Sequence, residues 1–141
     1  IHSILGQDAL TLVPPELHAR YRTHYRIGHA VGMGYLSGAW AGLLRAFPDH
    51  LTDQALMLSE AQRAQWFEHN VYHALATADE YVWVYSEQPN WWTNENIPAG
   101  FTEALGAAKA KHAAGQPLGF AIEQMMQDAQ ARAKANPPKK A

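Results

Sequence analysis

The sequence of 141 residues contains no cysteine. Disulfide scaffolds, cysteine nucleophiles and metal sites with thiolate ligands are therefore excluded, and the redox state of the compartment stays open. Charged residues are also scarce, at 17%, and the net charge is -2. Because so little positive charge is available to neutralise phosphates, we do not expect nucleic acid as a partner.

A strongly apolar run is missing as well. The stretch 27–44 has no Lys, Arg, Asp or Glu, but five glycines, Ser37 and His29 dilute its hydrophobicity. It barely reaches the length that a spanning helix needs, although its glycines at spacing four resemble those of paired membrane helices. We expect a buried helix or a glycine-rich core segment here, and no membrane partner.

The hydrophobic content of 48% is enough for a folded core. Ser59, with Gln62 three residues later, forms a capping box, which is typical of a helix start. A final segment rich in Pro and Lys predicts a mobile tail over 136–141, so that 1–135 is a single unit. Apolar spacing and breakers predict four helices: 16–29, continuing to about 47, then 59–78, 98–114 and 117–135.

Residues 81–85 are the most strand-like segment, because they alternate β-branched and aromatic side chains. Their lack of polar alternation predicts a parallel strand buried on both faces, between the helices 59–78 and 98–114. A single strand cannot satisfy its own backbone groups, and the candidate partners, 9–13 and 55–58, are short. We therefore expect an α/β chain, mostly helical, that is a piece of a larger α/β sheet or barrel; a small mainly-α domain is the alternative.

Glu87 follows the predicted strand by two residues, and in a barrel of parallel strands the active site lies at the carboxyl ends of the strands. A carboxylate beside indole and amide groups suits a carbohydrate, whose C–H faces stack on aromatic rings and whose hydroxyls bond to polar groups. The alternative is that Glu87 caps the next turn and the tryptophans are core residues. The candidate substrate-binding residues near Glu87 are Tyr85, Gln88, Asn90, Trp91 and Trp92.

His69 and His73 are four residues apart on the predicted helix 59–78, a spacing that suits a metal pair. The intervening residues lack the Glu of the H-E-x-x-H zinc motif, so zinc-protease chemistry is not supported. Surface or hydrogen-bonded histidines are the expected outcome, and we assign no metal or cofactor to the chain on the main interpretation.

The segment 70–107 resembles the C-terminal end of a family of bacterial barrel proteins, many uncharacterised and described as glycoside-hydrolase-like. The resemblance implies a (β/α)8 barrel whose last strand is 81–85, with Glu87 at the mouth, and it slightly favours a secreted or periplasmic protein. A barrel needs about 250 residues, so the remainder would lie in a missing segment or on a second chain. The motif consists of Ala74-Leu75, Asp79-Glu80-Tyr81-Val82-Trp83, Tyr85-Ser86-Glu87 and Trp91-Trp92.

Three functions remain open from the sequence. The first is a carbohydrate-active protein that hydrolyses glycosidic bonds, with Glu87 in the site and an oligosaccharide or polysaccharide as substrate. The second is a non-catalytic carbohydrate-binding or structural barrel, which needs the tryptophans but no acid pair. The third is a helical metal-binding protein that uses His69 and His73.

Overall fold

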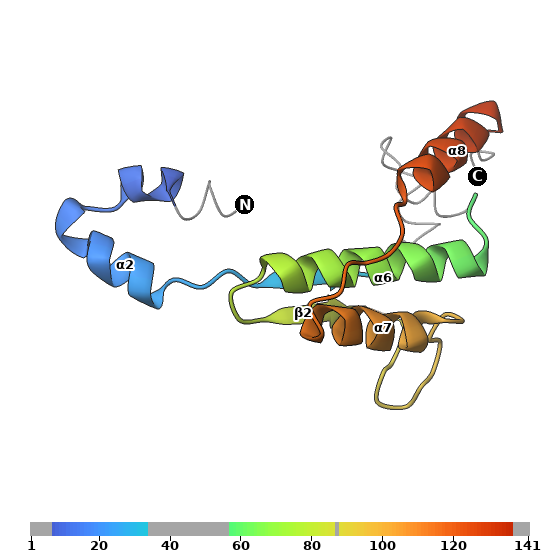
Figure 1. The fold of residues 1–141 in the computed structure, drawn as a ribbon, viewed down its shortest axis with the longest axis horizontal. Coiled ribbons are helices and arrows are strands. Elements are labelled where there is room, and N and C mark those ends of the chain that lie inside the picture. Colours follow the sequence, from blue (N-terminus) through green and yellow to red (C-terminus); the bar gives the residue numbers. More distant parts are fainter. Residues whose placement is uncertain (1–6, 34–56, 87, 137–141) are drawn as a thin grey trace.

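A computed structural model shows a mixed α/β chain, mostly helical, with one two-stranded parallel sheet, and it describes residues 7–33, 57–86 and 88–136. Helices α6 and α7 lie beside the sheet, whereas η1, η2 and α2 project from one end as an arm (Figure 1). Among the described residues, no helix is both long and apolar enough to cross a membrane. The elements are η1 (Asp8–Leu12), η2 (Pro15–Leu17), α2 (His18–His24), β1 (His29–Gly32), α6 (Glu60–Thr77), β2 (Val82–Tyr85), α7 (Phe101–Ala113) and α8 (Glu123–Ala135).

The strand predicted over 81–85 is confirmed as β2, but among the described residues neither 9–13 nor 57–58 pairs with it. Strand β1 pairs with β2 in parallel, in a register that sets His29 opposite Val82 and Gly32 opposite Tyr85. Residues 9–12 form a 3-10 turn and 57–58 lie in a turn, while 55–56 fall outside the described residues. The prediction for 9–13 was wrong because the partner that the structure shows lies in a glycine-rich segment that carries little strand signal of its own.

The helix predicted over 16–29 is shorter than expected. It comprises the 3-10 turn η2 and α2, which ends at His24, and the extended chain then leads into β1. A Cβ atom on Gly28 would lie 3.1 Å from both the Trp83 ring and the Tyr81 carbonyl oxygen. Glycine therefore lets this segment approach β2 closely, and strand pairing outweighs the local helical pattern. The predicted continuation over 34–47 lies outside the described residues.

The two strands are tied together at their amino ends by Asp79. Its carboxylate accepts a hydrogen bond of 2.7 Å from the Ile27 amide, and the Asp79 amide donates one of 2.8 Å to the Ile27 carbonyl. These two reciprocal hydrogen bonds fix the chain that precedes β1 against the chain that precedes β2. Asp79 therefore has a structural role at the edge opposite the predicted site.

Helix α6 confirms the prediction over 59–78, and its start shows both halves of the capping box. The Ser59 hydroxyl accepts from the Gln62 amide at 3.2 Å, and the Gln62 side chain accepts from the Ser59 amide at 3.0 Å. Such a cap stabilises a helix by about 1 kcal/mol. Further along, Phe67, Val71 and Ala74 form a buried stripe at helical spacing.

The core lies where α6 meets α7. The rings of Phe67 and Phe101 stack with centroids 4.6 Å apart, and both side chains are fully buried. Two buried alanines of α7, Ala104 and Ala108, leave room for α6 to approach. At the start of α7, Gly100 has φ of +80° and a Cβ atom there would lie 3.1 Å from that of Ala64, so glycine is needed for both conformation and space. The prediction of a helix over 98–114 is thereby confirmed as α7, with a start three residues later.

The prediction that β2 is buried on both faces is wrong. Val82 and Val84 pack against the core formed with α6 and α7. On the opposite face, Trp83 is 52% exposed and Tyr85 is 46% exposed. The reason is that the helices contact only the valine face, so the aromatic face of β2 stays open.

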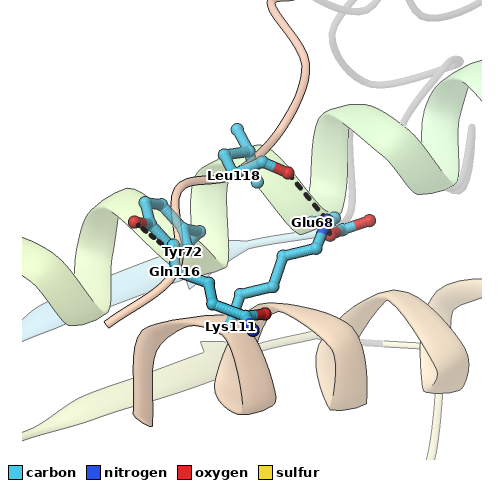
Figure 2. Close-up of polar contacts among 5 residues, drawn as sticks. All are labelled: Glu68, Tyr72, Lys111, Gln116 and Leu118. Carbon is cyan, nitrogen blue, oxygen red and sulfur yellow. Dashed lines mark hydrogen bonds and ion pairs between the residues drawn. The ribbon is translucent and has the colours of Figure 1, made fainter. Parts of the chain in front are cut away.

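The chain that leaves α7 crosses back over α6 and is held there by polar contacts (Figure 2). The Lys111 ammonium donates to Glu68 at 2.6 Å and to the Leu118 carbonyl at 2.7 Å. The Tyr72 hydroxyl donates to the Gln116 carbonyl at 2.8 Å. These bonds hold 116–118 in extended form, so the helix predicted over 117–135 starts only at Glu123, as α8. Of the predicted tail, 137–141 lie outside the described residues.

We expect Phe67→Ala to lower the free energy of unfolding by about 3–5 kcal/mol, because it leaves a cavity beside Phe101. Urea denaturation followed by circular dichroism measures the change. Leu12→Ala is the matched control, since Leu12 is 87% exposed on the arm, and it should change stability by no more than about 0.5 kcal/mol. Equal effects of the two substitutions would contradict the position of the core.

Candidate functional site at the carboxyl end of the sheet

The parallel register brings the carboxyl ends of β1 and β2 to one edge of the sheet, where Gly32 lies opposite Tyr85. The segment that follows β2 begins at this edge and leads to α7. In α/β folds ligands bind at this edge, because the loops after neighbouring strands converge there. Glu87, the predicted catalytic carboxylate, belongs to this segment but lies outside the described residues.

The loop after β2 is ordered by Asn90. Its side-chain oxygen accepts hydrogen bonds from the amides of Trp92 at 3.0 Å and Thr93 at 3.3 Å. The backbone amide of Asn90 donates to the Glu95 carbonyl at 2.8 Å, and this bond closes the loop at its base. Asn94 has φ of +59°, a left-handed conformation that asparagine tolerates better than most residues. Asn90 thus holds the tip of the loop in one shape.

The two adjacent tryptophans of the loop have different environments. Trp92 is 95% exposed at the tip, so its whole indole face meets solvent. Trp91 turns inward and packs against the core, with its ring centroid 6.4 Å from that of Phe67. The Trp91 Nε1 atom is buried and has no hydrogen-bond partner. Trp91 therefore anchors the loop to the core, and Trp92 is the exposed aromatic surface.

The remaining predicted residues surround this loop. Tyr85 lies half exposed at the end of β2, on the open aromatic face, and Gln88 is exposed. A second carboxylate, Glu95, accepts a hydrogen bond of 2.8 Å from the Thr93 hydroxyl within the same loop. The sequence interpretation did not single out Glu95, since its place beside the loop base follows from the fold of the loop.

A separate groove of about 370 Å³ lies between β1 and α6, and His29 and His73 line it. The Thr77 hydroxyl donates to the His73 carbonyl at 2.7 Å, so the His29 Nε2 atom is the donor in the 3.0 Å bond to the same hydroxyl. The sequence interpretation missed this contact, because His29 and Thr77 are 48 positions apart in the sequence.

His69 and His73 project side by side from α6, with ring centroids 4.4 Å apart. The pKa of His73 is lowered, first by its partial burial and second by the neighbouring His69, while Glu123 acts in the opposite direction. Within the described part of the chain, no group of three or more His, Cys, Asp or Glu residues is arranged to hold a metal ion. Among the described residues, His69 and His73 are therefore a pair of neighbouring imidazoles without a third ligand of these types.

Comparison with known proteins gives no assignment. No family model, curated protein or solved structure matches the chain.

We expect Asn90→Ala to release the tip of the loop, because two amides lose their acceptor, at a local cost of about 1 kcal/mol. Hydrogen exchange at the Trp92 and Thr93 amides should become several-fold faster. Asn90→Asp keeps an acceptor oxygen and should preserve slow exchange, and Gln88→Ala is the control within the same loop. Exchange that is equally fast in the wild type and in Asn90→Ala would contradict this account.

The lowered pKa of His73 predicts the direction of a pH effect on stability. Because the unfolded chain takes up the proton at a higher pH than the folded chain, the free energy of unfolding should fall as pH drops below about 6.5. Urea denaturation at pH 7.5 and 5.5 measures the fall in wild type and in His73→Gln, with His24→Gln as the control. The fall should be smaller in His73→Gln alone, and an equal fall in all three proteins would refute the assignment.

Proposed function

We propose that this chain supplies two successive strand–helix units of a (β/α)8 barrel, and that the barrel hydrolyses glycosidic bonds with Glu87 at its mouth. The observation that supports a ligand-binding role most strongly is the 95% exposed Trp92 on an ordered loop at the carboxyl end of β2. A large apolar ring held in solvent at this edge is typical of a binding surface rather than of a core residue.

The order and the packing of the elements support the barrel. β1, α6, β2 and α7 follow one another with parallel strands, and the helices cover one face of the sheet. On the other face, the small Ala30 and Gly32 stand opposite the large Trp83 and Tyr85. Barrel interiors are filled by side chains from neighbouring strands, and strands missing from this chain would cover the open face. The remainder of the barrel is therefore the proposed protein partner.

The loop after β2 supports a carbohydrate as the ligand. An exposed indole face stacks on the C–H face of a sugar ring, and Gln88 and Tyr85 offer groups that bond to hydroxyls. Trp91 stabilises the loop through its contact with Phe67. Such a surface suits an oligosaccharide or polysaccharide.

Hydrolysis requires two carboxyl groups on either side of the scissile bond. Glu87, two residues beyond β2, supplies one of them on this proposal. Glu95 already accepts a bond from Thr93, so the second carboxyl group is expected from another strand end of the barrel. The distance between the two groups then selects retention, at about 5–5.5 Å, or inversion, at about 6.5–9.5 Å.

We expect Glu87→Gln to reduce kcat on soluble xylan, cello-oligosaccharides or chito-oligosaccharides by about a hundred- to ten-thousand-fold, with binding largely retained. Glutamine keeps the shape of the side chain but can neither give nor take the proton. Release of reducing ends measures turnover, and calorimetry measures binding in the protein that contains the complete barrel.

Trp92→Ala should instead weaken oligosaccharide binding by about tenfold, because it removes the stacking surface, whereas Trp92→Phe should retain most of the affinity. Binding without turnover in the wild type would select the non-catalytic carbohydrate-binding alternative. Full turnover in Glu87→Gln would remove Glu87 from the chemistry, and full affinity in Trp92→Ala would refute the binding surface.

A further inference from the structure

A second site candidate lies on α6, separate from the loop after β2. His69 and His73 are one helical turn apart, so both imidazoles project from the same face, and their ring centroids are 4.4 Å apart. Two imidazoles at this spacing are a well-suited pair of ligands for one metal ion.

The separation fits a specific coordination geometry. A metal ion about 2.1 Å from one nitrogen of each ring places the ring centroids about 4.5 Å apart when the angle between the two bonds is near 90°. A tetrahedral angle requires about 5 Å. The observed 4.4 Å is therefore compatible with two adjacent positions of a square-planar or octahedral ion once one nitrogen of each ring faces the ion, and a tetrahedral ion needs a further outward rotation of the rings.

The surroundings of His69 also suit a ligand. Its Nδ1 atom lies 3.3 Å from the side-chain oxygen of Asn70, which is an acceptor, so Nδ1 carries the proton and Nε2 keeps its lone pair. Metal-binding histidines commonly donate their second ring nitrogen in this way, which fixes the tautomer and the ring orientation. The His73 ring is exposed at the groove beside β1, so an ion has an open approach.

We infer that His69 and His73 together bind one divalent transition-metal ion on the surface of α6. The described residues bring no third ligand to the pair, so water fills the other coordination positions. Imidazole ligands favour Cu²⁺, Ni²⁺ and Zn²⁺, with Cu²⁺ bound most tightly, and they do not favour Mg²⁺. Without the Glu of H-E-x-x-H there is no general base beside the ion, so the site binds metal and does not follow the zinc-protease pattern. This inference is independent of the proposed carbohydrate activity.

The test is titration of the untagged protein with CuSO4, NiCl2, ZnCl2 and MgCl2 by calorimetry. We expect one Cu²⁺, Ni²⁺ or Zn²⁺ ion per chain and no binding of Mg²⁺. His69→Ala and His73→Ala should each weaken binding by about tenfold or more, since either change leaves a single imidazole. His112→Ala removes an exposed histidine from α7 and should leave the affinity within twofold.

Electron paramagnetic resonance of the Cu²⁺ form gives a second readout, with hyperfine splitting from two ring nitrogens in wild type and fewer in either single variant. Circular dichroism identifies any variant that fails to fold, and His69→Gln and His73→Gln then replace the alanine variants. Absence of binding by wild type, or tight binding that survives both substitutions, would overturn the inference.

Discussion

The parallel pairing of β1 with β2 is the constraint on which the rest of the structure depends. Parallel strands cannot be joined by a tight turn, because the chain must first return to the end of the sheet at which the first strand began. Helix α6 lies on this return path and buries its apolar stripe against the valine face of the sheet. Asp79 fixes the strands at their amino ends, so their carboxyl ends meet at one edge. The loop with Trp92 follows from that edge.

Among the described residues, helices cover the sheet on one side only. Parallel sheets are normally buried on both faces, whereas here Trp83 and Tyr85 remain about half exposed opposite Ala30 and Gly32. The same strands therefore display two kinds of surface, an apolar face that the helices fill and an aromatic face without helices. On the proposed function the second face belongs to the interior of the barrel, and the carboxyl edge belongs to its mouth.

The sequence predicted the elements whose signals are local. The capping box at Ser59 and the stripe through Phe67 defined α6, and the β-branched and aromatic run defined β2. Strand β1 escaped prediction because His29–Gly32 contains one β-branched residue and one glycine, and a second glycine, Gly28, precedes it, so only its pairing with β2 makes it a strand. The open face of β2 could not be predicted either, since it depends on which side α6 and α7 pack.

In the candidate site, too, some features follow from local sequence signals and others depend on tertiary packing. The position of the loop at the strand end follows from the motif, but Trp91 and Trp92 are adjacent and chemically identical, and only the contact with Phe67 distinguishes the anchor from the exposed ring. The spacing of His69 and His73 was visible in the sequence, whereas the bond between His29 and Thr77 depends on the sheet.

The central claim, that the exposed ring after β2 binds carbohydrate, is tested most directly by ¹⁹F nuclear magnetic resonance of protein labelled with 5-fluorotryptophan. The chain has five tryptophans, of which Trp92 is 95% and Trp66 is 5% exposed, so their signals report different environments. Titration with xylan, cello-oligosaccharides and chito-oligosaccharides should shift the Trp92 signal saturably with at least one of them and leave the Trp66 signal unchanged. A Trp92 signal that does not respond to any of these sugars, or that moves only together with Trp66, would contradict the account.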